Sequence, residues 1–175
     1  SSSSAASDVY KRQEKYLINH PYLVIAFIVV SLATIWIVLF TNTEEKTPAT
    51  SDQVSAQLVE LGYEPVDMTD YYEQYCHGLK KTVFTQSRYI RFYFFELNNN
   101  DNAGAVYRNW YHQIKEATGG AVYSSTEDYY NYSGFYVYDD DMYYHLVWVD
   151  NTVVMAFGGK NYKNDIFKIL EAIGY

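Results

Sequence analysis

A run of nineteen consecutive uncharged residues, numbered 22–40, constrains this chain more than any other feature. The run begins at Tyr22 and ends at Phe40, and as a helix rising about 1.5 Å per residue it would span about 28 Å. That length is close to the thickness of a bilayer's hydrocarbon core, about 30 Å. The hydroxyls of Ser31 and Thr34 can bond to carbonyls of their own helix. The sequence therefore predicts a transmembrane helix over residues 22–40.

The residues before this run fall into two parts. Residues 3–13 (SSAASDVYKRQ) resemble the translation of an adapter used in DNA sequencing. We therefore expect residues 1–13 to be a sequencing artefact and the native chain to start near Glu14. Such an artefact also indicates that the sequence comes from DNA sequenced in bulk from the environment. The alternative is a natural serine-rich tail. In either case residues 14–21 form a short flank before the span.

The flanks of the span predict how the chain sits in the membrane. The run is long for the core of a cleaved signal peptide, and no A-x-A site follows it, so we expect an uncleaved anchor. Lys15 precedes the span, whereas Glu44 and Glu45 follow it. Positive flanks stay on the cytoplasmic side. We therefore expect residues 41–50 to be a short polar linker and residues 51–175 to lie outside the cytoplasm.

Charge and cysteine content exclude several classes of function. The chain carries 21 Asp and Glu against 13 Lys and Arg, a net charge of −8. Nucleic-acid binding needs clustered Lys and Arg against phosphates, so no nucleic-acid partner is expected. Cys76 is the only cysteine, which excludes an intramolecular disulfide and a cysteine-based zinc site. No H-E-x-x-H, phosphate-loop or EF-hand pattern is present, and we expect neither a metal nor a cofactor.

The spacing of apolar residues after the linker predicts one α+β domain of ordinary size. Capping boxes, asparagines and glycines mark where helices begin and end. The predicted helices run from Thr50 to Gly62, from Asp70 to Gly78, from residues 98–101 to Gly119, and from Asn161 to Gly174. Segments rich in aromatic and β-branched residues predict strands at residues 88–97, 121–124, 134–138, 142–149 and 152–157.

This order of elements predicts a two-layer domain, in which a mostly antiparallel sheet carries helices on one face. The nearest arrangement is split-βαβ, or ferredoxin-like. Asp150 and Asn151 fit a two-residue hairpin turn between the last two strands. The general layout resembles that of small membrane-anchored bacterial domains, but no motif names a family.

Tyrosine is the outlier of the composition, with 21 tyrosines in 175 residues. An exposed tyrosine offers apolar area and a hydroxyl at little entropic cost, which suits binding surfaces. Tyr136 and Tyr138 share one face of a predicted strand, and Tyr144 on the next strand extends that patch if the register allows. We predict that these three residues bind a protein, peptide or other envelope ligand. The alternative is that they fill out a half-buried sheet.

An enzyme of the cell surface is the alternative function. His77 follows Cys76, and such a pair can supply a nucleophile or a metal ligand. Adjacent residues usually project in different directions, however, and the many carboxylates offer no pair at a defined separation. The predicted function is therefore a single-pass membrane-anchored binding protein, with a hydrolase that uses dispersed carboxylates or His77 as the alternative.

Overall fold

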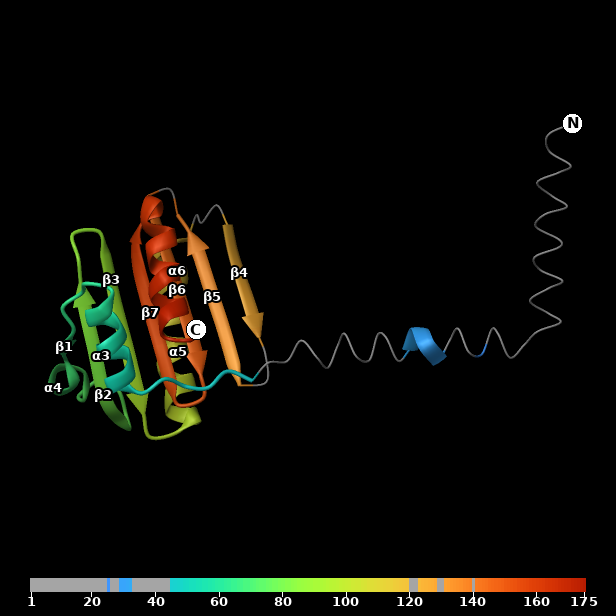
Figure 1. Cartoon of the computed structure of the whole chain (residues 1–175), viewed down its shortest axis with the longest axis horizontal. Helices are drawn as coiled ribbons and strands as arrows, with labels where there is room; N and C mark the ends of the chain where they lie inside the picture. The colour runs from blue at the N-terminus through green and yellow to red at the C-terminus, as the bar shows by residue number, and fades with distance from the viewer. Residues whose placement is uncertain (1–24, 26–28, 33–44, 120–122, 129–130, 140) are drawn as a thin grey trace, which may run out of the picture. The chain divides into compact units, whose positions relative to one another are not determined.

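The computed structural model describes residues 25, 29–32, 45–119, 123–128, 131–139 and 141–175, with backbone alone for 123–128 (Figure 1). The chain divides into two compact units, Ser1–Glu44 and Glu45–Tyr175. The predicted artefact and flank lie outside the described residues, as does most of the predicted span. Across the described ranges, none of the helices combines the length and the apolar character that crossing a bilayer requires.

Seven strands within the described residues form one sheet in the second unit. Its order is β1-β2-β3-β7-β6-β5-β4, and every neighbouring pair is antiparallel. The strands are β1 (Val66–Asp67), β2 (Leu79–Gln86), β3 (Ile90–Leu97), β4 (Tyr123–Asp128), β5 (Tyr132–Tyr138), β6 (Met142–Val149) and β7 (Thr152–Gly159).

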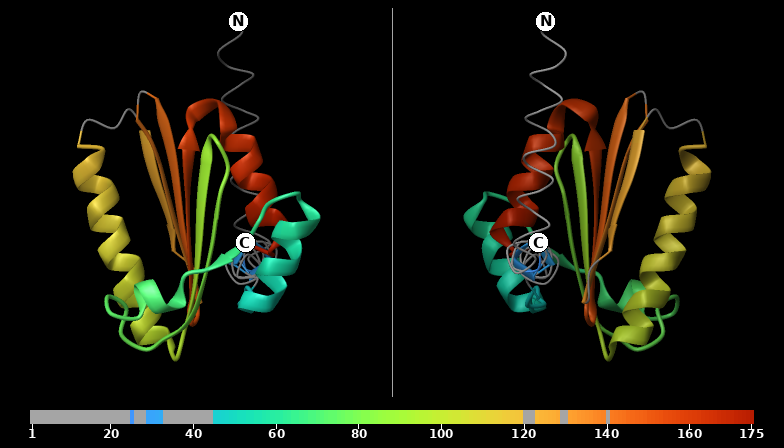
Figure 2. Two further views of the ribbon diagram at one scale, coloured as in Figure 1. Left: turned by 90° about the vertical axis from the view of Figure 1, so that its left-hand side faces the viewer. Right: turned by 90° about the vertical axis from the view of Figure 1, so that its right-hand side faces the viewer.

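Helices cover both faces of this sheet, as Figure 2 shows. On one face lie α3 (Ser51–Glu60) and α6 (Lys163–Ala172), and on the other lies the long helix α5 (Asn100–Ala117). A short helix, α4 (Thr69–Tyr72), packs beside β2. Phe94 and Phe95 are both 0% exposed and belong to opposite cores, because successive side chains of a strand point to opposite faces.

The α+β class and the antiparallel sheet packed against helices are confirmed. The prediction that the helices share one face is wrong, because α5 packs on the face opposite α3 and α6. The reason lies in β3, whose apolar side chains point to both faces, so that each face needs a cover. In the described residues α5 joins β3 to β4, two strands of the same direction that are separated in the sheet by β7, β6 and β5. This is one split βαβ crossover, whereas the predicted ferredoxin-like arrangement has two.

Two local predictions also need correction. Strand β2 was not predicted, because Lys80 and Lys81 interrupt its apolar pattern at a bulge in the pairing with β3. The last helix is preceded by a 3-10 turn, Lys160–Tyr162, and no side chain caps α6, so Asn161 is not its cap. The capping box of α3, formed by Thr50 and Gln53, is confirmed.

The described part of the predicted linker, residues 45–50, lies against the domain. The Asn131 side-chain amide donates to the carbonyl of Lys46 at 2.7 Å and accepts from its N–H at 3.2 Å. Farther along, the Ala49 N–H donates to the Tyr175 hydroxyl at 3.2 Å. These bonds attach the segment that precedes α3 to Asn131, next to the start of β5, and to Tyr175.

Candidate functional site

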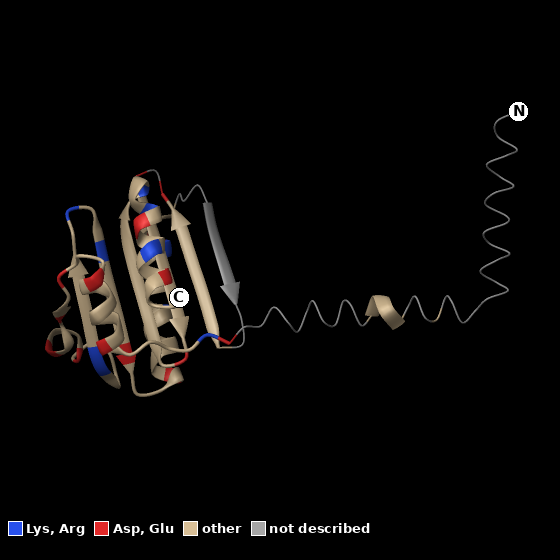
Figure 3. Ribbon diagram, in the orientation of Figure 1, with Lys and Arg blue, Asp and Glu red and all other residues tan. Residues whose placement is uncertain are grey.

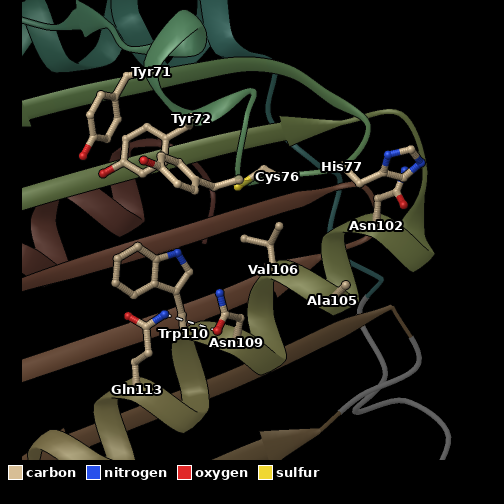
Figure 4. Close-up of a pocket in the computed structure, with 11 residues that line it drawn as sticks. Tyr71, Tyr72, Cys76, His77, Asn102, Ala105, Val106, Asn109, Trp110 and Gln113 are labelled. Atoms are coloured by element: carbon tan, nitrogen blue, oxygen red, sulfur yellow. Dashed lines mark hydrogen bonds between the residues drawn. The ribbon is translucent and has the colours of Figure 1, made fainter.

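A groove of about 410 Å³ lies between α4, with the turn that follows it, and α5 (Figure 4). One wall carries Tyr71, Tyr72 and Tyr75, and the facing wall carries Trp110. The remaining lining side chains are small, apolar, carboxamide, thiol or imidazole groups, and none is Lys, Arg, Asp or Glu. The volume lies within the range of about 300–1,000 Å³ that is usual for ligand sites.

Hydrogen bonds to Thr69 hold α4 against the sheet. The N–H and the hydroxyl of Thr69 donate to Asp67 Oδ1 at 2.9 and 2.5 Å, and the N–H of Thr82 donates to Thr69 Oγ1 at 3.0 Å. The bonds from Thr69 lower the pKa of the Asp67 carboxyl. The predicted cap at Asp70 is wrong, because Met68 is the N-cap of α4 and makes no side-chain cap bond. The polar contacts at the start of this helix are those between Thr69 and Asp67.

The tyrosine wall combines exposed rings with an anchored one. Tyr71 is 54% exposed and Tyr75 is 67% exposed, with ring centroids 5.9 Å apart. Tyr72 is half-buried, and its ring makes a T-shaped contact with Phe95, with the ring centroids 5.3 Å apart. Burial, with smaller contributions from Tyr93 and Tyr71, raises the pKa of Tyr72 to about 12. A phenol is protonated at neutral pH even without this rise in pKa, so the hydroxyl is a hydrogen-bond donor.

The other wall is a polar stripe along α5. This helix buries Val106 and Ile114 against the sheet. Asn102, Asn109 and Gln113 line the groove at spacings of seven and four residues, which places them along one side of the helix. The Gln113 side chain donates to Asn109 Oδ1 at 3.2 Å. Trp110 stands on the same side, across the groove from Tyr72 (Figure 4).

Cys76 and His77, the pair behind the predicted enzyme, both line this groove. Cys76 is half-buried, and burial raises the pKa of its thiol, which disfavours the thiolate that nucleophilic chemistry needs. His77 is exposed and lies beside Asn102 at the end of the groove (Figure 4). Within the described ranges no hydrogen bond joins the thiol to the imidazole, so the structure shows no activated pair.

The predicted tyrosine site is divided between the two faces of the sheet. Tyr136 and Tyr138 are on the α6 side, with ring centroids 6.2 Å apart. Tyr144 pairs across the strands with Val137, so its side chain points to the α5 side. The three tyrosines therefore do not form one patch, because the register of β5 and β6 places Tyr144 behind the other two.

Tyr144 instead belongs to a row of aromatic rings on the α5 side of the sheet. It stacks on Phe157 at 5.6 Å, and Phe157 stacks on Tyr93 at 6.3 Å. Tyr93 lies 6.1 Å from Trp110. Burial raises the pKa of Tyr144, and the nearby Asp139 carboxyl raises it further. The row therefore extends from Tyr144 through Phe157 on β7 and Tyr93 on β3 to Trp110, which lines the groove.

On the α6 side, the tyrosines surround a buried histidine. His145 is 8% exposed, and its Nδ1 lies 2.8 Å from the Tyr143 hydroxyl. Burial, together with the positive charges of Lys46 and Lys163, lowers the pKa of His145 to about 4. Burial also raises the pKa of Tyr143, so a protonated hydroxyl is paired with a neutral imidazole. Tyr136, Tyr138, Tyr143 and His145 therefore pack together as part of the core on the α6 side of the sheet.

The sequence directed attention to Tyr136, Tyr138 and Tyr144, and it did not single out Trp110, Asn102, Asn109 or Gln113. A usable signal was present, since the carboxamides share one helix face next to Trp110. The sequence did not show where α4 lies, and α4 with the turn after it supplies the tyrosine wall opposite α5. No group of three His, Cys, Asp or Glu side chains that could hold a metal occurs among the residues that the structure describes.

Comparison with known proteins assigns no family to this chain. No protein-family model and no curated protein matches the sequence. Among solved structures, the chain is similar to the crystal structure of a GTP binding regulator from Thermotoga maritima. The two share 15% sequence identity with a TM-score of 0.44, and the match covers 71% of this chain and 87% of the other.

Proposed function

We propose that this protein is a membrane-anchored binding module, whose groove between α4 and α5 takes an uncharged ligand of the cell envelope. The observation that carries the proposal is the groove's lining. The chain carries a net charge of −8, and its acidic and basic residues are spread over the described elements (Figure 3). Aromatic rings and carboxamides nevertheless line the groove, and none of its lining residues is Lys, Arg, Asp or Glu. A charged ligand would find no opposite charge there to offset its lost hydration.

The two exposed tyrosines support binding over a purely structural role. Tyr71 and Tyr75 leave more than half of their surface in water, although aromatic rings gain free energy by leaving it. Rigid amphipathic rings around a hollow are typical of recognition sites, where they carry much of the binding free energy. A ligand that covers them would bury apolar area without displacing any side chain of the core.

The groove favours binding over hydrolysis. Hydrolysis by paired carboxylates needs two of them in the site, and the lining has none. A cysteine nucleophile needs a lowered pKa, whereas burial raises that of Cys76. The hydrolase that uses His77 therefore has less support than the binding module.

The location of the groove follows from the proposed anchor. The apolar run of residues 22–40, with Lys15 before it and Glu44 after it, supports a single span with residues 45–175 outside the cytoplasm. A domain held there meets envelope proteins, peptides and polymers. The proposal therefore places the ligand in the envelope.

One experiment on the full-length chain tests both the anchor and the groove. Membranes that contain it are washed with alkaline carbonate, dissolved in a polyoxyethylene detergent and mixed with insoluble envelope fragments from a bacterial host. We expect the wild-type chain to stay with the membrane and then to sediment with the fragments. Trp110→Ala or Tyr75→Ser should weaken that binding by about 2 kcal/mol, or roughly 30-fold, as truncation of a central aromatic does.

Tyr89→Ser is the matched control, because Tyr89 is 45% exposed but lies on the β2–β3 hairpin, outside the groove. It should bind the fragments as the wild type does. Tyr75 is mostly exposed, so its replacement leaves folding intact. Wild-type binding by Tyr75→Ser would contradict the role of the groove, and release of the wild-type chain by carbonate would contradict the anchor.

A further inference from the structure

The groove between α4 and α5 presents hydrogen-bonding groups of both kinds. Asn102, Asn109 and Gln113 each carry an amide that donates and an oxygen that accepts. The bond from Gln113 to Asn109 uses one donor and one acceptor of this set. Among the described residues, no other side-chain hydrogen bond is made by these three amides or by the indole N–H of Trp110. The stripe therefore has donors and acceptors left for a ligand.

The balance of these groups restricts the ligand. A phosphodiester or a carboxylate only accepts hydrogen bonds, and it would leave the carboxamide oxygens without donors once it covers them. A proline-rich segment also lacks N–H donors, although aromatic grooves bind such segments. An acyl chain supplies neither group. A ligand that satisfies the stripe must donate and accept at neighbouring positions, as vicinal hydroxyls do.

The aromatic rings add a second requirement. Trp110 and the tyrosines of the facing wall offer flat apolar surfaces on both sides of the hollow. The ligand therefore needs apolar faces as well as a polar edge, and no net charge. A pyranose ring has this combination, because its C–H groups form two apolar faces and its hydroxyls form the rim.

We propose that the groove binds a neutral saccharide segment, with the sugar rings against Trp110 and Tyr75 and the hydroxyls bonded to Asn109 and Gln113. This inference rests on the proposed function and names its ligand class. The volume of about 410 Å³ suits a short segment of a polymer rather than an extended chain. The segment enters from the solvent side, where Tyr71 and Tyr75 are exposed.

Calorimetric titration of the full-length chain with neutral oligosaccharides tests the inference. The chain is held in a polyoxyethylene detergent, which carries no sugar, and the probes are N-acetylated chitotetraose, cellotetraose and maltotetraose. We expect at least one of them to bind, and the double variant Asn109→Asp with Gln113→Glu to bind it at least about tenfold more weakly, because each change removes a donor. Asn164→Asp, on exposed α6 surface, is the matched control and should bind normally.

Hexaproline is titrated in parallel as the competing ligand class. If hexaproline binds and none of the three oligosaccharides does, the saccharide is the wrong ligand. Equal binding of an oligosaccharide by the wild type and the double variant would also overturn the inference, since the sugar would then lie elsewhere. In both cases the proposed function stands if Tyr75→Ser still loses the envelope fragments, so the two failures are distinguishable.

Discussion

Phe94→Ala and Phe95→Ala should each lower the free energy of unfolding by about 3–5 kcal/mol, the usual cost of removing a buried phenylalanine side chain. The two residues are neighbours in β3 and both are 0% exposed. Phe94 packs in the core under α3 and α6, whereas Phe95 packs in the core under α5. Equal losses are therefore expected only if helices cover both faces of the sheet. Urea unfolding followed by circular dichroism measures them.

A partly exposed residue gives the reference for these two variants. Val59 is 60% exposed on α3, and Val59→Ala should change the stability by less than about 0.5 kcal/mol. If either alanine variant fails to fold, Phe94→Leu and Phe95→Leu measure the same comparison at a smaller cost, under about 1.5 kcal/mol. A loss confined to one of the two positions would show that one face of the sheet is open to solvent.

His145 should make the domain lose stability as the pH falls from about 6.5 to about 4. Burial lowers its pKa to about 4 in the fold from the ordinary histidine value of 6.5, so in this window the unfolded chain binds a proton that the folded chain does not. The contribution of His145 to the free energy of unfolding is fully present above pH 6.5 and decreases as the pH falls toward 4. The full difference is about 3 kcal/mol, reached near pH 4.

His145→Gln separates this effect from other groups that titrate in the same range. The glutamine side chain can still exchange a hydrogen bond with the Tyr143 hydroxyl, as donor or as acceptor, but it does not titrate. Unfolding free energies of the wild type and of His145→Gln, measured from pH 7 to pH 4, should converge toward low pH. His112→Gln, at an exposed position on α5, should follow the wild type. Parallel curves for wild type and His145→Gln would contradict a buried, neutral imidazole.

Local signals in the sequence placed several elements well. The capping box at Thr50 starts α3, the asparagines at 98–100 start α5, and Asp150 and Asn151 form the turn between β6 and β7. In each case the signal and its partner lie within a few residues of one another, so no tertiary information is needed. Of these elements, α5 forms one wall of the groove.

The faces of the sheet and the groove depended on contacts between distant residues. Tyr144 was placed with Tyr136 by the pattern of the strands alone, and a shift of one residue in register moves a side chain to the opposite face. Strand β2 contains Lys80 and Lys81, so its pattern does not read as a strand. The facing wall was missed because α4 is held by Thr69 against β2, which its own short sequence does not reveal.

The reactivity of Cys76 measures occupancy of the groove most directly. Cys76 is the only cysteine of the chain, and it lines the groove between α4 and α5. Alkylation of the full-length chain by N-ethylmaleimide is followed by mass spectrometry, with and without bound envelope fragments, and unfolded chain serves as the unprotected control. We expect bound fragments to slow the alkylation of Cys76 severalfold. An unchanged rate on chain that is bound to the fragments would contradict the groove as the binding site.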